Sequence, residues 1–165
     1  MRLYHGGTAT IEKPQLLTSA ITVRTTDFGN GFYTTTSLEQ AERWVKIRRS
    51  RHQISGGVVS IFETENDLFD HKELNCLIFK SADEQWLNFV MKNRMNMAFS
   101  HEYDVVAGPV ANDNVYVVLT LFERGLLDVA EVLHRLKTYK LADQILFHTD
   151  KSLRKLTYIG SEEIP

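Results

Sequence analysis

The amino-acid sequence predicts an α+β protein. Segments with the β-branched content of strands are mixed with segments of helical periodicity, without the regular strand–helix–strand alternation of a parallel α/β fold. The length of 165 residues suits one domain, and a chain of this size buries enough surface to fold without a disulfide or a metal. We therefore expect residues 1–165 to form a single α+β domain.

The first third of the chain is predicted to hold two strands and a helix. Residues 2–5 indicate a short strand that ends at Gly6-Gly7. A loop rich in Thr and Ser covers 18–26, and loops of this length often have a function. Two aromatic residues and three Thr then predict a strand over 32–36, and a helix from Leu38 to about Arg51 follows it.

Two capping-box patterns mark the starts of predicted helices. Ser37 to Gln40 precedes the helix just described, and Ser81 to Glu84 precedes a helix that continues to about Arg94. In each pattern a hydroxyl can accept from a backbone amide of the first turn while an acidic or amide side chain reaches back. The two helices are therefore predicted from local capping as well as from apolar spacing.

The rest of the chain adds further strands and helices. The strands are predicted from their β-branched and apolar content, and the helices from apolar residues spaced three and four apart. The strands cover 58–62, 76–79, 103–108, 144–147 and 156–159, and the helices cover 115–122 and 128 to about 139.

Charge and cysteine content exclude several classes of protein. The net charge of −2 excludes a globally basic nucleic-acid binder. The single Cys76 cannot form an intrachain disulfide and fits a reducing compartment. The N-terminus lacks the apolar segment of a signal peptide, and no apolar run reaches the roughly 20 residues of a membrane span. We expect a cytoplasmic protein with no membrane partner.

The most informative segments are Asp27-Phe28-Gly29-Asn30-Gly31-Phe32-Tyr33 and Tyr4-His5-Gly6. The glycines allow a sharp turn before the strand, and the turn can present a ring to a flat ligand. Tyr33 can stack on a planar ring, and the imidazole of His5 can donate a hydrogen bond to a sugar hydroxyl. A core tyrosine and a histidine in an ordinary turn are the alternative interpretations.

Trp44 and Gln144 carry a weaker signal. Trp44 offers a second ring on the first helix, but it shares a helix face with Ala41 and Arg48 and equally suits packing. Gln144 follows Asp143 at the start of a late strand, where a polar edge residue is ordinary.

Positive charge is concentrated toward the end of the first predicted helix. The basic residues there are Arg43, Lys46, Arg48, Arg49 and Arg51. A phosphate contact with a nucleotide or a nucleic acid is one interpretation. A solvated helix C-terminus, where cations interact favourably with the helix dipole, is the other. The six His and one Cys are scattered without the spacing of metal ligands, so no metal site is expected.

Taken together, these motifs resemble those of the ADP-ribosyltransferase superfamily, and most closely a group of small bacterial ADP-ribosyltransferase-like proteins with an Asp-Phe-Gly-x-Gly-Phe-Tyr signature. Tyr4-His5-Gly6 is similar to the strand with the superfamily's His, and Gly29 to Tyr33 is similar to its Gly-x-Gly-x-Tyr strand. Asp143 to Phe147 falls where the third motif strand, with the catalytic Glu, is expected. The similarity covers nearly the whole chain and implies two small packed sheets, a split β-sandwich, flanked by helices.

The resemblance implies that NAD+ binds between the two sheets and that its nicotinamide–ribose bond is cleaved. It implies that His5 hydrogen-bonds the adenosine ribose, that the backbone of Gly6 holds the nicotinamide amide, and that Tyr33 stacks on the nicotinamide ring. Trp44 would form the second wall of this pocket, and Arg24 would contact the pyrophosphate.

The chain departs from the superfamily pattern at Gln144, which stands where His-Tyr-Glu members carry Glu. Glycosidic cleavage passes through an oxocarbenium-like transition state, which a carboxylate stabilises and a neutral amide does not. Neutral hydrogen bonds are worth about 1 kcal/mol and charged ones ~1.5–3, so we expect a rate lower by one or two factors of ten. The acceptor must then be ionised already or be deprotonated by another group, for which Asp143 and Asp113 are candidates.

The resemblance therefore implies an NAD+-dependent mono-ADP-ribosyltransferase, a bacterial toxin or defence effector that modifies a nucleic acid or a protein and releases nicotinamide. Toxic members of such groups usually have a neutralising antitoxin partner. An NAD+ glycohydrolase, an NAD+-binding or interaction module without turnover, and a purely structural protein are the alternatives that the sequence leaves open.

Overall fold

A computed structural model describes residues 1–16, 26–53, 55–96, 98–110, 113–137 and 141–165. Within these residues the fold is α+β, with two small sheets and helices, as the sequence predicts. Arg24 and most of the predicted 18–26 loop lie outside the described residues.

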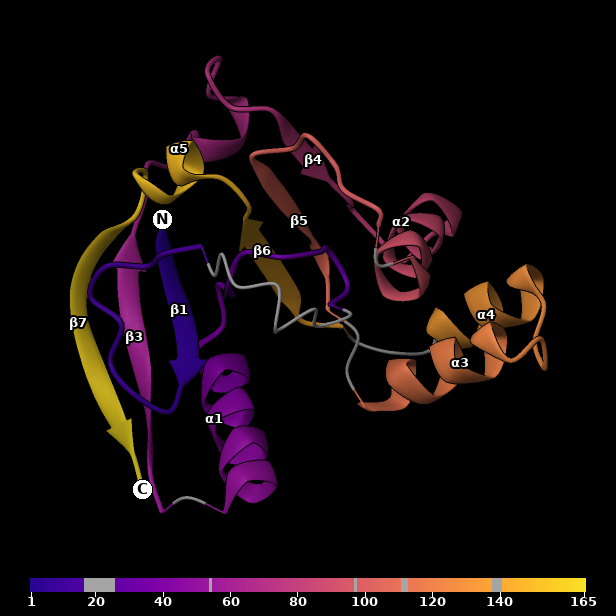
Figure 1. The fold of residues 1–165 in the computed structure, drawn as a ribbon, viewed down its shortest axis with the longest axis horizontal. Helices are drawn as coiled ribbons and strands as arrows, with labels where there is room; N and C mark the ends of the chain where they lie inside the picture. The colour runs from indigo at the N-terminus through magenta and orange to yellow at the C-terminus, as the bar shows by residue number, and fades with distance from the viewer. Residues whose placement is uncertain (17–25, 54, 97, 111–112, 138–140) are drawn as a thin grey trace.

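Sheet A has three strands and sheet B has four (Figure 1). In order across the sheet, sheet A consists of β1 (Arg2–Gly7), β3 (Gly57–Glu63) and β7 (Thr157–Ile164), and sheet B of β2 (Phe32–Thr34), β6 (Asp143–Phe147), β5 (Val105–Pro109) and β4 (Cys76–Ile78). The helices are α1 (Leu38–His52), η1 (Leu68–Asp70), α2 (Glu84–Met95), α3 (Asp113–Glu123), α4 (Val129–Leu136) and α5 (Asp150–Leu153).

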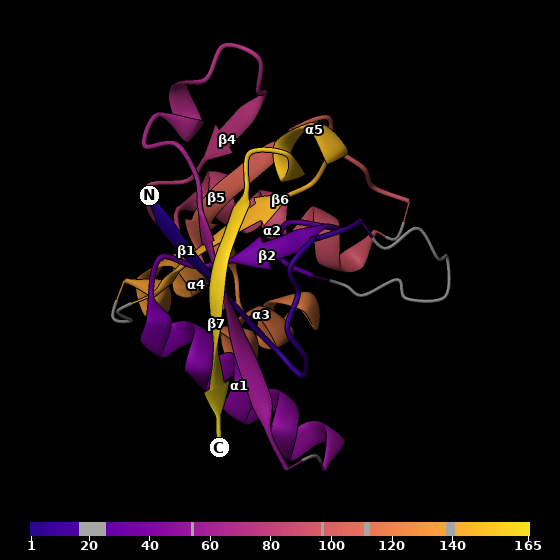
Figure 2. The same ribbon diagram turned by 90° about the vertical axis from the view of Figure 1, so that its left-hand side faces the viewer.

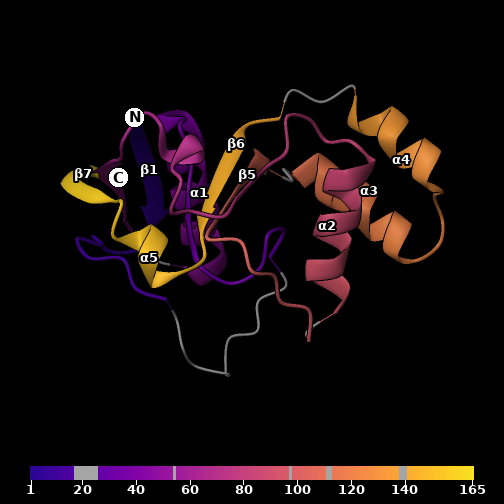
Figure 3. The same cartoon turned by 90° about the horizontal axis from the view of Figure 1, so that it is seen from above.

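The two larger apolar clusters lie between the layers. Seen from above, sheet A, sheet B and helices α2, α3 and α4 follow one another across the molecule (Figure 3). The cluster between the sheets contains the fully buried Leu3 and Phe147, and the cluster between sheet B and the helices contains Trp86 and Leu146. The alternation along β6 explains this, because Leu146 and Phe147 point to opposite faces of sheet B.

Helix α1 covers sheet A, and β7 forms an outer edge of that sheet (Figure 2). The buried Ala41 and Val45 of α1 pack on Val59 of β3. Ser37 begins the helix by accepting a hydrogen bond from Gln40 N at 3.2 Å, as the capping pattern predicts. Local sequence and tertiary packing therefore agree at this helix.

The two sheets meet at edge strands β1 and β2. Tyr4 N donates to Thr35 O at 2.9 Å, and Thr35 N donates to Tyr4 O at 3.0 Å. Among the described residues this is an isolated bridge, and β1 and β2 do not continue it as a ladder. Beyond this pair the described residues of β1 and β2 are not paired as strands, and this unpaired stretch is called the split below.

Several predicted boundaries were wrong because partners distant in sequence extend or shorten the elements. Strand β1 does not end before Gly6 but continues through Gly7, which pairs with Val58 of β3. Strand β2 ends at Thr34 rather than residue 36, because Thr36 N donates instead to the carboxylate of Asp143.

Other differences concern helix starts and short elements. The N-cap of α2 is Asp83, which accepts from Trp86 N at 3.0 Å, and not Ser81. Helices η1 and α5 and the last residues of β7 were not predicted. None of the helices in the described part of the chain is both long and apolar enough to cross a membrane.

Candidate functional site

The split between β1 and β2 brings His5 and Tyr33 together. His5 Nδ1 lies 2.6 Å from the backbone oxygen of Tyr33, and because a carbonyl only accepts, Nδ1 carries the proton. The imidazole also stacks on Phe32, with ring centroids 4.4 Å apart. Strand β2 therefore holds the His5 ring by a hydrogen bond and by stacking.

Burial makes His5 a neutral side chain. Desolvation, with a smaller contribution from the nearby charge of Arg48 on α1, lowers the pKa of His5 to about 4 although the bond to Tyr33 opposes the shift. With Nδ1 protonated, Nε2 carries a lone pair and accepts a hydrogen bond. A sugar hydroxyl would thus donate to His5, whereas the sequence suggested that His5 donates.

The two glycines that follow His5 have different roles. A Cβ at Gly7 would lie 3.6 Å from His5 Nε2, so the absent side chain opens the space beside this acceptor. A Cβ at Gly6 would collide with the backbone oxygen of Ala41 and would lie 3.3 Å from Trp44 Cβ. Gly6 is therefore required for the close approach of α1 to β1, and the Cβ of Trp44 lies on the α1 side of Gly6.

The backbone of Gly6 faces the split. In an antiparallel strand, alternate residues direct their N–H and C=O groups to opposite sides. Tyr4 directs both groups to Thr35 of the opposite edge, so Gly6, two residues further, directs its own groups to the same side. This backbone can offer one donor and one acceptor to a ligand between the sheets.

The hydroxyl of Tyr33 makes its hydrogen bonds within the protein. Its hydroxyl donates to Gly29 O at 2.6 Å and accepts from Phe28 N at 3.1 Å, and its burial raises the pKa of Tyr33. The ring is half-buried and packs against the cluster beneath α2 and α3. Tyr33 thus has the structural role of closing a turn, and its ring face is the part that can contact a ligand.

The turn before β2 requires two glycines. Gly29 has φ +93 and Gly31 has φ +148, in the region that side chains disfavour. A Cβ at Gly31 would lie 2.5 Å from the backbone oxygen of Phe147, so the turn presses directly on β6. The signature glycines therefore place the turn, and with it Asp27, against the third motif strand.

Two histidines that sequence reasoning missed hold the same turn. His101 Nε2 lies 2.8 Å from Phe28 O, and His148 Nδ1 lies 2.5 Å from Asn30 O. Their rings are 4.3 Å apart, and burial followed by the charge of His148 lowers the pKa of His101 although its hydrogen bond to Phe28 opposes the shift. Neither residue belongs to a recognisable motif, so only the fold reveals their role.

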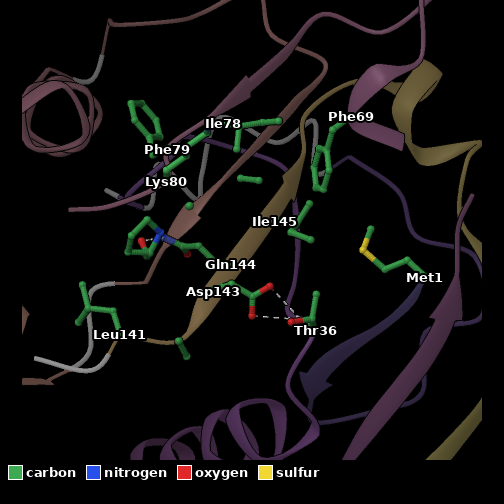
Figure 4. A pocket seen from close by; sticks show the side chains of 14 residues that line it. Met1, Thr36, Phe69, Ile78, Phe79, Lys80, Leu141, Asp143, Gln144 and Ile145 are labelled. Carbon is green, nitrogen blue, oxygen red and sulfur yellow. Dashed lines mark hydrogen bonds between the residues drawn. The ribbon is translucent and has the colours of Figure 1, made fainter. Parts of the chain in front are cut away.

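Gln144 lies on the buried side of β6, next to the signature turn. The residue is 8% exposed, and Nε2 donates to Asp27 Oδ2 at 3.3 Å and to Pro109 O at 3.4 Å. An open hollow of about 300 Å³ adjoins it, and Phe79, Lys80 and Leu141 are among its lining residues (Figure 4). His5 and Tyr33 do not line this hollow in the described structure.

The sequence suggested Asp143 and Asp113 as alternative bases, and the structure describes the side chain of Asp143. The carboxylate of Asp143 accepts from Thr35 Oγ1 at 2.8 Å and from Thr36 N at 3.2 Å, which ties β6 to the start of α1 (Figure 4). Asp143 is thus engaged in structural hydrogen bonds. The side chain of Asp113 lies outside the described part of the structure.

The basic residues of α1 do not form one uniform patch. Arg49 donates to the carbonyl of Pro165 at the C-terminus, Arg48 acts electrostatically on His5, and Arg43 and Lys46 are exposed. The side chain of Arg51 is outside the described structure. Among the described residues, no group of three or more His, Cys, Asp and Glu is arranged to hold a metal ion.

The chain matches a known protein family. The family described as "Protein of unknown function (DUF3990)" matches residues 1–158. Neither the curated proteins nor the solved structures include a significant match to the chain.

Proposed function

This chain belongs to the DUF3990 family, whose function is unknown, and we propose that it is an NAD+-dependent mono-ADP-ribosyltransferase. The observation that carries the proposal is the split between β1 and β2, where the His5 ring and the backbones of Gly6 and Tyr33 converge. Gln144 stands on β6, the strand paired with β2, and is linked to Tyr33 through the signature turn. These residues come from strands β1, β2 and β6 of the two-sheet core.

The chemistry of each group fits one part of NAD+. The outward N–H and C=O of Gly6 match the carboxamide of nicotinamide, which has one acceptor and one donor edge. The ring of Tyr33 suits stacking on the pyridinium. The lone pair of neutral His5 suits a ribose hydroxyl that donates. Trp44, whose Cβ lies on the α1 side of Gly6, would supply an aromatic wall there.

Positive charge near His5 supports binding of the pyrophosphate. The charge of Arg48 contributes to the lowered pKa of His5, so Arg48 on α1 is a candidate for this role. Arg24, in the segment outside the described residues, remains the sequence-based candidate for the same role. The exposed Arg43 and Lys46 suit contacts with a nucleic-acid acceptor.

Gln144 would contact the nicotinamide ribose in the transition state. Its neutral amide gives a hydrogen bond without the charge of a carboxylate, so slow transfer of a single ADP-ribose is expected. A toxin or defence effector with a cognate antitoxin is the physiological role that the resemblance favours.

Incubation of the purified protein with adenylate-labelled NAD+ and separately with RNA, DNA and cell proteins tests the proposal. We expect nicotinamide release together with label on one class of macromolecule. Gln144→Ala should slow nicotinamide release by about tenfold or more, because it removes the transition-state hydrogen bond. The matched change Gln85→Ala, at an exposed position of α2, should leave the rate unchanged.

Three other outcomes would contradict transferase activity. Free ADP-ribose and nicotinamide without labelled macromolecule would indicate an NAD+ glycohydrolase. NAD+ binding in a calorimeter without turnover would indicate a binding module. Intact NAD+ with no heat of binding, from folded protein, would leave only a structural or interaction role.

A further inference from the structure

A chain of four polar side chains, buried except at the partly exposed Glu123, runs beneath sheet B. Gln144 Nε2 donates to Asp27 Oδ2 at 3.3 Å, Arg94 Nη1 lies 3.3 Å from Asp27 Oδ1, and Arg94 Nε lies 3.1 Å from Glu123 Oε1. The side chains of Arg94 and Asp27 are only 8% and 12% exposed. No local sequence pattern indicates this chain, because its members lie on the signature turn, α2, α3 and β6.

Arg94 fixes the position of Asp27. Its guanidinium lies 4.7 Å from the ring centroid of Tyr116 and contacts two carboxylates, so packing and charge hold it from several sides. A buried ion pair is costly to break, since loss of one partner leaves an uncompensated buried charge. Asp27 is therefore a rigid acceptor next to Gln144.

This arrangement determines the orientation of the Gln144 amide. The two acceptors near the Gln144 side chain, the Asp27 carboxylate and the Pro109 carbonyl, take the hydrogens of Nε2. The reversed amide would place Oε1 against two other oxygens. The carboxamide oxygen is thus the atom left to receive a hydrogen bond from a bound ligand.

We propose that Asp27 is a positioning residue that orients Gln144 so that its Oε1 accepts a ribose hydroxyl of NAD+, a role that rests on the proposed transferase function. The same contact explains why an amide and not a carboxylate suits position 144. A Glu there would place two carboxylates about as close as the present 3.3 Å contact, and like charges at such a distance disfavour ionisation. The carboxylate of Asp27 therefore favours Gln over Glu at position 144.

An exchange of the carboxylate at position 27 with the amide at position 144 tests the positioning role of Asp27. Gln144→Glu should lower the rate of nicotinamide release from NAD+ by about ten- to a hundredfold, because it replaces the hydrogen bond to Asp27 with repulsion. The double variant Asp27→Asn with Gln144→Glu should recover at least half of the wild-type rate, since the amide introduced at position 27 can donate to the carboxylate introduced at position 144. The matched change Gln85→Glu on exposed α2 should leave the rate unaltered.

A second measurement does not depend on turnover. In the Gln144→Glu variant, NMR titration of the introduced carboxyl should give a pKa above the usual range of Glu, because Asp27 lies beside it. In the double variant with Asp27→Asn, the pKa of the same carboxyl should be lower. An active Gln144→Glu single variant, or equal pKa values of this carboxyl in the two proteins, would overturn the inference. The wild type could fail to turn over NAD+ while the pKa of the introduced carboxyl still differs between the two variants. That result would count against the proposed function but would support the coupling between Asp27 and Gln144.

Discussion

A single hydrogen bond decides the chemistry of His5. Because His5 Nδ1–H donates to the Tyr33 carbonyl, the ring presents Nε2 as an acceptor, and burial prevents a second proton from binding near neutral pH. Sequence identifies the residue but not its tautomer, since the tautomer depends on a carbonyl 28 positions away. At the scale of single residues, what His5 can bind depends on its hydrogen-bond partner as much as on its being a histidine.

The buried neutral His5 should make stability depend on pH. Its folded pKa of about 4 is below the unfolded value of 6.5, so the unfolded state binds more protons between these pH values. Stability is therefore retained above pH 6.5 and lost as pH falls toward 4. At about pH 5 the wild type should lose about 2 kcal/mol more than His5→Asn, relative to about pH 7, in urea unfolding.

The Asn side chain in this comparison can still donate to Tyr33 O, so it controls for the hydrogen bond while it removes the titration. Other histidines, including His101 with its lowered pKa, remain in both proteins and cancel. Equal pH dependence in the two proteins would show that His5 is not the buried neutral group described above.

The Tyr33 hydroxyl and the Tyr33 ring have separable roles. Tyr33→Phe removes the acceptor of Phe28 N and leaves Gly29 O with the Thr26 hydroxyl as its donor, so the free energy of unfolding should fall by about 1–3 kcal/mol. The ring remains, so the Kd for NAD+ measured by calorimetry at a temperature where the variant is folded should change by less than about threefold.

Tyr116→Phe is the matched control, since Tyr116 is 56% exposed and should tolerate the loss of its hydroxyl. If Tyr33→Phe weakened NAD+ binding strongly with unchanged stability, its hydroxyl would be a ligand contact and the turn-closing role would be wrong.

At the scale of elements, helix α1 and strand β1 are pressed together at Gly6. A Cβ there would collide with the backbone oxygen of Ala41, and backbone cannot move aside as a flexible side chain can. Gly6→Ala should therefore lower the free energy of unfolding by about 1–3 kcal/mol or more through overpacking. Thermal or urea unfolding measures this change.

Gly56→Ala provides the comparison for this substitution. A Cβ at Gly56 would meet no atom within 4 Å, so its effect on unfolding should stay within about 0.5 kcal/mol. Equal destabilisation by the two substitutions would mean that α1 can shift away from β1, and that Gly6 is not needed for their close approach.

Elements with local signals were predicted well, and elements that need distant partners were not. Helix α1 begins after Ser37, and the Asp128 cap begins α4, because each cap bonds an amide three residues away. Strand β1 passes through Gly6 and Gly7 only because β3 pairs with it. Asp27 and Arg94 meet across 67 residues, which no local pattern can indicate. The sequence accordingly indicated the motif residues of the candidate site, but not the side-chain contacts that hold these residues in place.

At the scale of the whole molecule, two sheets share one described backbone bridge, Tyr4 with Thr35, and a common apolar cluster. A dinucleotide bound beyond the bridge would contact β1 of sheet A and β2 of sheet B together. Binding would then stabilise the association of the sheets, because a ligand of the folded state alone adds its binding free energy to folding.

We therefore expect NAD+ to raise the midpoint of thermal unfolding. At about a hundred times the Kd, the stabilisation of about 2.7 kcal/mol corresponds to roughly 5–10 °C for a chain of this size. Hydrogen exchange should slow at Gly6, whose amide faces the split, while the amides of β7 on the far edge of sheet A should be less affected. ADP-ribose, which lacks nicotinamide, serves as the control and should protect Gly6 less. Protection confined to the hollow near Pro109 and Leu141, with Gly6 unchanged, would locate the ligand outside the split and contradict the convergence on which the proposed activity depends.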